Sequence, residues 1–208
     1  MLCQFTVKNF KSIRDEATFD MQAAAISEHE DRIIKDKDGE LYLPVSAIYG
    51  PNGGGKSNVL EALHNLSLKV LRPLYAASDN EERVISRKKL VMEPFAFSEK
   101  KKEEPTEFEV FFRTKLAEYR YILSTKRDLI LYERLDRVKL DTGRKSALFE
   151  RGDEGITLKG AVARLKISDE LSDTVPLLSY LGITYRKNEV VKDVLDWFEF
   201  GIVFMNYG

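Results

Sequence analysis

The stretch from Gly50 to Ser57, GPNGGGKS, constrains the fold of this chain more than any other feature. Its spacing, Gly-x-x-x-x-Gly-Lys-Ser, is that of a P-loop, where glycines allow successive backbone N–H groups to point inward around phosphate oxygens. Such a loop joins a strand to a helix, and the positive end of that helix faces the phosphates. The motif therefore predicts an α/β fold with a nucleotide polyphosphate as ligand.

The residues around the motif support this interpretation. The apolar run from Val45 to Tyr49 predicts a short strand that leads directly into the glycines. After the loop, Val59, Leu60, Leu63, Leu66 and Val70 recur at helical spacing, and Pro73 is expected to end the helix.

Each polar residue of the loop has an expected role. Lys56 is predicted to reach the terminal phosphates, where its charge also serves catalysis, and the Ser57 hydroxyl to complete the coordination of Mg²⁺. Asn52 lies at the crest of the loop, where its amide could meet the terminal phosphate or an attacking water. The predicted nucleotide-binding residues in this stretch are Gly50, Asn52, Gly53, Gly54, Gly55, Lys56, Ser57 and Asn58.

Composition excludes several classes of protein. The chain has 208 residues, of which 43% are hydrophobic, and no run of 18 apolar residues that would indicate a membrane span. Its start lacks the apolar segment of a secretory signal, so a cytoplasmic location is expected. One cysteine and two histidines give no zinc cluster by spacing, and a net charge of −1 argues against a uniformly basic nucleic-acid binder.

Period-2 patterns predict strands outside the motif. Cys3, Phe5 and Val7 lie on one face of an N-terminal strand, and residues 17–21 are a candidate antiparallel partner. Asp38-Gly39 is a dipeptide typical of turns. The stretch from Asp36 to Gly39 also resembles a calcium-binding loop, but such a loop needs an acidic residue at position 34, where the chain has Ile34, so we predict a turn. Further strands are predicted at residues 108–113, 119–125, 129–135 and 147–151, joined by short turns into antiparallel sheet, and the charged run 99–104 is expected to be a solvated loop.

A GTPase is an alternative class. Thr125-Lys126-Arg127-Asp128 fits a guanine-reading pattern, but no Asp-x-x-Gly switch element follows the P-loop. The same four residues lie between two predicted strands, so a hairpin turn explains them better.

Several stretches together resemble one family. They are the opening residues 7–16, VKNFKSIRDE; the loop GPNGGGKSN followed by VLEAL; and residues 93–95, 105–112 and 119–121. These resemble the AAA15-type ATPases of the RecF/SMC/OLD branch of ABC-like ATPases. The similarity extends through residues 133–135, 148–151 and 197–198, so it covers nearly the whole chain.

The resemblance implies an ABC-type head in which two copies sandwich ATP and Mg²⁺, so that the partner would be a second copy of the chain. Members commonly act in DNA repair or phage defence, often beside a nuclease or toxin. In relatives, the basic residue and serine of the N-terminal stretch lie near the nucleotide, and these map onto Lys11 and Ser12.

The chain departs from this family in its acidic residues. An ABC-type hydrolase needs four apolar residues followed by Asp-Glu, where the Asp holds magnesium and the Glu polarises water. Neither the run ending at Glu133 nor that ending at Asp196 has this pattern. We therefore expect an N-terminal half that a second half completes; the alternatives are completion by another chain, or nucleotide binding without turnover.

The remaining residues give weaker signals. Ten basic residues against five acidic ones between residues 113 and 145, with tyrosines among them, make DNA contact conceivable. Residues 165–178 look helical in parts, and Val190, Val191, Val194, Leu195 and Phe198 predict an amphipathic helix. The expected organisation is a P-loop lobe with added antiparallel strands over residues 1–158 and a helical segment over residues 159–208, without a membrane partner.

Overall fold

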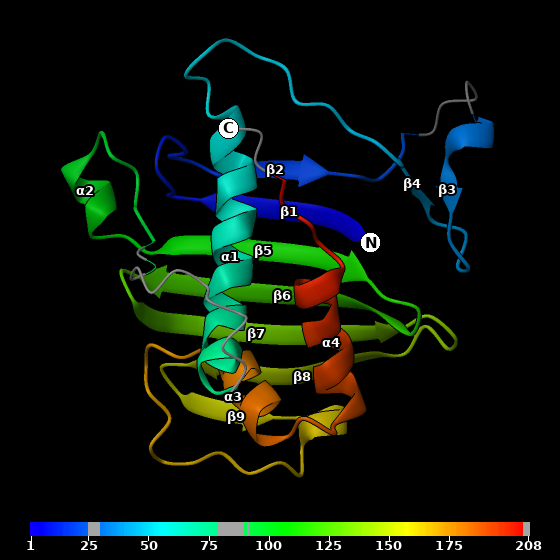
Figure 1. The fold of residues 1–208 in the computed structure, drawn as a ribbon, viewed down its shortest axis with the longest axis vertical. Coiled ribbons are helices and arrows are strands. Elements are labelled where there is room, and N and C mark those ends of the chain that lie inside the picture. Colours follow the sequence, from blue (N-terminus) through cyan, green and yellow to red (C-terminus); the bar gives the residue numbers. More distant parts are fainter. Residues whose placement is uncertain (25–29, 79–89, 91, 206–208) are drawn as a thin grey trace.

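A single large antiparallel sheet organises the chain in the computed structural model, which describes residues 1–24, 30–78, 90, 92–205 (Figure 1). The strands of this sheet follow the order β2-β1-β5-β6-β7-β8-β9. Their bounds are β1 Leu2–Lys8, β2 Ala17–Asp20, β5 Thr106–Arg113, β6 Ala117–Lys126, β7 Leu129–Lys139, β8 Lys145–Gly152 and β9 Gly155–Leu158.

The predicted strand pairings in this sheet are confirmed. β2 pairs with β1 in antiparallel register, with Phe5 opposite Phe19. The four strands predicted between residues 108 and 151 correspond to β5 to β8, and each pairs with the next. Burial alternates strictly along β6, which is why its period-2 pattern was readable in the sequence.

Helices cover one face of the sheet (Figure 1). Helix α1, Lys56–Ala76, crosses the strands steeply, and its C-terminal end meets α3, Leu177–Thr184. Helix α4, Glu189–Phe200, lies beside α1 and confirms the predicted amphipathic helix. The indole of Trp197 stacks on Phe112 of the sheet with ring centroids 3.9 Å apart. Helices and sheet thus share one apolar core, and the division of the chain at residue 158 stays a prediction.

Short elements fill the connections. They are the 3₁₀ helices η1 Glu30–Arg32 and η2 Gly160–Val162, the small hairpin of β3 Ile34–Lys35 and β4 Leu41–Tyr42, and α2 Glu99–Lys102. The predicted turn at Asp38-Gly39 connects β3 to β4, where the Gly39 N–H donates to Asp36 O at 3.0 Å. The turn between β6 and β7 holds Arg127 at a φ of 57°, so the hairpin interpretation of residues 125–128 is confirmed.

Four local expectations are wrong. Residues 45–49 are irregular and exposed, because none of the described strands pairs with them. Pro73 lies inside α1, which continues to Ala76. Residues 99–102 form α2 instead of a loop, because the Ser98 side chain accepts a hydrogen bond from the Lys101 N–H and caps the helix. Between residues 165 and 176 no helix forms, and the helical part begins at Leu177.

Candidate functional site

The glycine-rich loop stands at the N-terminal end of α1, at the upper edge of the molecule in Figure 1. Gly53 and Gly55 have φ angles of 79° and 84°, a region that side chains other than glycine rarely adopt. A side chain at Gly55 would also meet the Ser12 hydroxyl, because an ideal Cβ would lie 3.1 Å from Ser12 Oγ. Two of the four glycines are therefore required by the backbone itself.

Lys56 is held over this loop. Its Nζ donates hydrogen bonds to the carbonyl oxygens of Gly50 and Pro51, both at 2.8 Å. Because both acceptors belong to the start of the loop, the side chain bends back across the loop and its ammonium group lies beside Gly50 and Pro51. Lys56 therefore lies against the loop that it was predicted to serve, and its contact with phosphate stays a prediction.

The first turn of α1 is open to an anion. No side chain caps the helix and its first turn contains no acidic residue. The partial positive charge of the helix end therefore has no carboxylate in that turn to offset it. Ser57 and Asn52 are exposed beside it, as a phosphate or magnesium contact requires.

Lys11 and Ser12 lie next to α1, the helix that follows the P-loop. The Asn58 side chain donates from Nδ2 to Ser12 Oγ at 2.6 Å. Lys11 forms an ion pair with Glu61 on the second turn of α1. The turn that carries both residues follows β1 directly, so the N-terminal strand brings them to the loop. Whether they touch a nucleotide stays a prediction.

Asn9 organises this turn, and our sequence interpretation missed it. Its side chain is fully buried, its φ is 55°, and its Nδ2 donates to the carbonyls of Lys101, Glu104 and Pro105. Its Oδ1 accepts from the Phe95 N–H at 3.0 Å. The available signal was an asparagine at the end of a strand, since asparagine tolerates the left-handed region better than most residues.

The carboxylate that most nearly matched a catalytic position is far from the loop. Glu133 is fully buried and accepts hydrogen bonds from the N–H groups of Leu177 and Leu178 at 2.6 and 2.9 Å and from the Tyr121 hydroxyl at 3.0 Å. Burial raises the pKa of this carboxyl, and the two backbone donors oppose that rise. Glu133 therefore caps α3, next to the C-terminal end of α1, and the loop lies at the opposite end.

Basic residues of the central strands are paired with acids. Arg120 pairs with Glu109, Arg134 with Asp136, and Lys126 with Glu103. Such pairing reduces the positive charge that this region could offer to a DNA backbone. The number of basic residues in this region therefore overstates the positive charge that is available to bind DNA.

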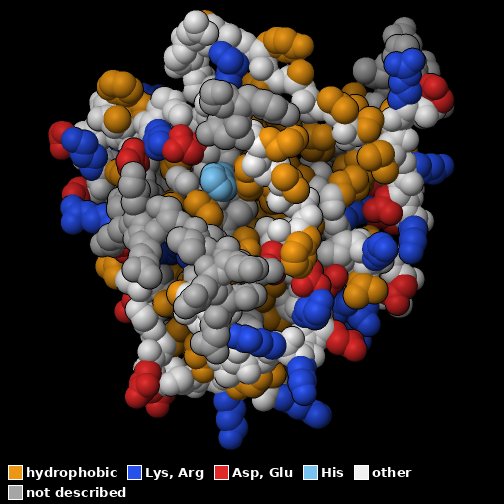
Figure 2. All heavy atoms as spheres, viewed as in Figure 1, with side chains coloured by type: hydrophobic (Ala, Val, Ile, Leu, Met, Phe, Trp, Pro, Cys, Tyr) orange, Lys and Arg blue, Asp and Glu red, His pale blue; other side chains and the backbone are white. Residues whose placement is uncertain are grey.

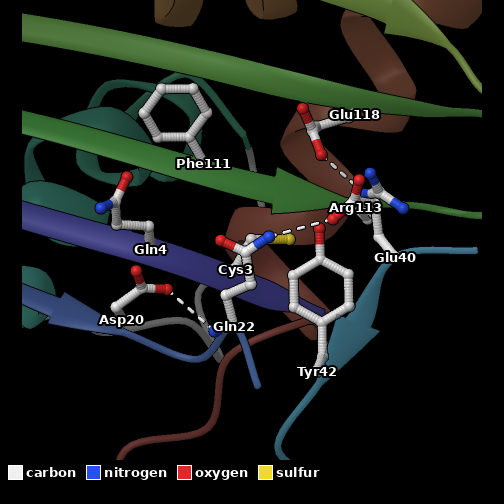
Figure 3. Close-up of a pocket in the computed structure, with 9 residues that line it drawn as sticks. All are labelled: Cys3, Gln4, Asp20, Gln22, Glu40, Tyr42, Phe111, Arg113 and Glu118. Carbon is white, nitrogen blue, oxygen red and sulfur yellow. Dashed lines mark hydrogen bonds and ion pairs between the residues drawn. The ribbon is translucent and has the colours of Figure 1, made fainter. Parts of the chain in front are cut away.

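A second polar site lies on the N-terminal strands (Figure 3). It is a cavity of about 250 Å³ whose lining includes Cys3, Tyr42, Arg113 and Glu118. Arg113 donates to Glu118 and to Asp36 and Asp38 of the β3–β4 hairpin at 2.7 to 3.0 Å. Burial raises the pKa of the Cys3 thiol to about 11 and also raises the pKa of Tyr42. The guanidinium of Arg113 therefore has its hydrogen-bond partners within the chain. Because Asp36 and Asp38 belong to the β3–β4 hairpin and Arg113 to β5, these ion pairs hold the hairpin against the sheet.

Apolar side chains are exposed on the face of the sheet that the helices cover (Figure 2). The most exposed large ones next to the loop and on α1 are Val45, Tyr49 and Leu60, at 78%, 90% and 52% exposure. Phe204, near the C-terminal end, stacks against His64 of α1 with ring centroids 4.5 Å apart.

The residues present fit a nucleotide polyphosphate with magnesium. A loop whose glycines adopt left-handed angles, a lysine bent over it and an uncapped helix end together provide donors and positive charge for phosphate oxygens. The hydroxyl of Ser57 is of the type that such loops use for Mg²⁺.

Comparison with known proteins agrees with this geometry. A family model described as "AAA domain, putative AbiEii toxin, Type IV TA system" matches residues 45–169, which is more than half of the chain and includes the loop. No curated protein matches the chain significantly. Within the described residues, no helix has the length and apolar character needed to cross a membrane.

Proposed function

Because this chain belongs to the AbiEii-toxin-like AAA domain family, we propose that it binds ATP and Mg²⁺ at residues 50–58. An AAA-type ATPase domain with nucleotide-binding character is what the family establishes. The identity of the base, the metal and the residue roles belong to the proposal.

One observation carries the proposal. The start of α1 presents an uncapped helix end, two glycines in left-handed conformation and the Lys56 ammonium within one short loop. The positive charge here comes from the helix end and from Lys56, and the first N–H groups of a helix have no partner within the helix. The first turn of α1 contains no acidic residue that would offset this charge. A polyphosphate would offset the charge and accept from these N–H groups at once.

The residues would divide the work as follows. Loop N–H groups and Lys56 would stabilise charge on the transferring phosphoryl group, and bound Mg²⁺ would supply further charge neutralisation when Ser57 helps hold it. Lys11 and Ser12 would line the same site from the N-terminal turn. Hydrolysis also needs a group that orients the attacking water, and in the ABC-type mechanism that group is a carboxylate. Glu133 and Asp196 do not provide it, since one caps α3 and the other pairs with Lys192 on α4.

For the cellular role, we propose an ATP-dependent component of phage defence or DNA repair. The ATPase would dimerise around ATP, with the acidic pair supplied by residues outside this chain and a nuclease or toxin as the effector. The family description, which names a toxin and a type IV toxin–antitoxin system, supports the defence role.

The test is the substitution Lys56→Ala. We expect the affinity for Mg-ATP, measured by titration calorimetry, to fall by about tenfold or more, because a hydrogen bond to a charged group is lost. The thermal unfolding midpoint should stay unchanged, since within the described residues the Lys56 ammonium donates its hydrogen bonds to carbonyls of the exposed loop. Retained affinity in Lys56→Ala would overturn the assignment of the loop.

A second function is a nucleotide-sensing module that binds ATP without turning it over. It is favoured by the positions of Glu133 and Asp196, neither of which is available to orient water at the loop. Phosphate release by the chain in its natural assembly separates the two functions: ATP turnover there excludes the sensing module. A preference for GTP over ATP would instead revive the GTPase alternative.

A further inference from the structure

Phe97 is an aromatic side chain with no evident structural role. Its side chain is 83% exposed, and it sits immediately before α2 on the segment that runs beside the N-terminal turn. Its ring meets the ring of Phe95 edge to face, with centroids 5.6 Å apart and an interplanar angle of 67°. The contact with Phe95 supports one side of the ring, and the rest faces water.

Backbone hydrogen bonds tie this segment to the turn beside the P-loop. The Lys11 N–H donates to Glu93 O at 3.0 Å, and the Ala96 N–H donates to Lys11 O at 3.0 Å. The next residue of the turn, Ser12, is the one that contacts Asn58 of α1 and faces Gly55. Ala96, the residue before Phe97, is therefore linked to the start of α1 through Lys11 and Ser12.

Asn9 makes the connection rigid. Its buried amide bonds to the segment on both sides of Phe97, to the Phe95 N–H and to carbonyls at Lys101, Glu104 and Pro105. A side chain carried on such a fixed backbone loses little conformational freedom when a ligand binds to it.

We propose that Phe97 stacks against the base of the nucleotide whose phosphates the loop holds, an inference that rests on the proposed function. A nucleobase is a flat, weakly hydrated ring separated from its phosphates by a ribose, so it needs an aromatic surface to one side of the P-loop. Stacking of a base on an aromatic side chain contributes strongly to affinity and tolerates different bases, because every base has a π face.

Tyr49 is the rival aromatic residue. It is 90% exposed and directly precedes Gly50. Among the backbone hydrogen bonds of the described residues, none ties Tyr49 to the N-terminal turn, whereas the segment that carries Phe97 is bonded to that turn through Glu93 and Ala96. We therefore assign the base to Phe97, and Tyr49→Ala tests the alternative.

The experiment compares two ligands, Mg-ATP and magnesium tripolyphosphate, because the second has the phosphates without the base. Calorimetry on the full chain would measure both dissociation constants for Phe97→Ala, Tyr49→Ala and Lys56→Ala. Phe200→Ala is the matched control, since Phe200 is also an exposed phenylalanine, 65% accessible, on α4. We expect Phe97→Ala to weaken Mg-ATP about tenfold while tripolyphosphate binding stays unchanged.

The outcomes separate this inference from the proposed function. If Lys56→Ala weakens both ligands and Phe97→Ala weakens only Mg-ATP, both stand. If Lys56→Ala weakens both ligands while Phe97→Ala changes neither or changes both equally, the stacking role is overturned and the phosphate site stands. Unchanged binding of both ligands in Lys56→Ala overturns the proposed function, and the stacking role with it.

A tryptophan substitution at position 97 tests the stacking role independently, by fluorescence. Phe97→Trp keeps an aromatic surface and adds a fluorophore at the proposed stacking position. We expect Mg-ATP to quench its fluorescence and tripolyphosphate to leave it unchanged. Equal response to both ligands, or to neither, would contradict base stacking.

Discussion

Helices α1 and α3 begin in opposite ways. The N-terminal end of α3 receives the buried carboxylate of Glu133, which accepts two of its N–H groups. The N-terminal end of α1 receives no side chain and has no acid in its first turn. Both ends carry the same partial positive charge, so the difference lies in what the fold brings to each of them.

The difference separates structure from function within one molecule. At α3 the anion belongs to the chain, is buried in the core, and contributes to stability. At α1 the corresponding place is exposed and lies beside Lys56 and Ser57, and it is where we propose that the phosphates of the nucleotide bind. The following changes would break or sharpen this comparison, in decreasing order of expected effect.

Removing the internal anion should have the largest effect. Glu133→Ala leaves the two α3 amides and the Tyr121 hydroxyl without their acceptor and leaves nearby Arg151 with less compensation. We expect the free energy of unfolding, measured by urea denaturation, to fall by about 3 to 5 kcal/mol. Glu150→Ala, which removes a half-exposed glutamate on the adjacent strand, is the control and should cost about 1 kcal/mol or less. Equal losses in the two variants would refute the capping role of Glu133.

A substitution in the P-loop should affect both stability and binding. Gly55→Ala forces a side chain into a φ of 84° and toward the Ser12 hydroxyl. We expect it to cost about 1 to 2 kcal/mol of stability and to abolish Mg-ATP binding. Gly143→Ala introduces the same backbone strain, at a φ of 63° with no atom within 4 Å of its Cβ. It should cost a similar amount of stability with nucleotide binding intact, and loss of binding there would show that the effect is not local.

A carboxylate placed at the open helix end should convert it into a closed one. Ser57→Asp puts a negative charge in the first turn of α1, which should stabilise the helix by about 0.3 to 1 kcal/mol. The same charge should repel phosphate and prevent Mg-ATP binding. Stability and binding are therefore expected to change in opposite directions. Ser57→Asn, which is uncharged, should give neither the gain in stability nor the electrostatic loss of affinity.

The pH dependence of stability should contain a small contribution from His64, midway along the exposed side of α1. Burial lowers its pKa below the ordinary value of 6.5, so the folded state favours the neutral ring. Its contribution to stability is present above about pH 6.5 and is lost as the pH falls through the folded pKa. Denaturation at several pH values should show a shallower decline for His64→Gln than for the original chain between pH 7 and 5. Parallel curves would contradict this contribution.

The predictions that succeeded depend on local patterns. The alternation of burial along β5 and β6, the amphipathic spacing in α4 and the glycine spacing of the P-loop each span a few consecutive residues. The predicted strand at residues 45–49 failed because a strand needs a partner, and the described residues provide none. A suitable local sequence was therefore insufficient there.

The sequence by itself determined that a P-loop stands before a helix, that an antiparallel sheet follows, and that no acidic pair of the hydrolase type accompanies them. Tertiary structure decided which groups meet. Glu133 caps a helix 44 residues away in sequence, Asn9 fixes a segment near residue 100, and Ser12 reaches Asn58. These contacts join residues that are distant along the chain, and their formation depends on the shared core that places sheet and helices together, which no local pattern encodes.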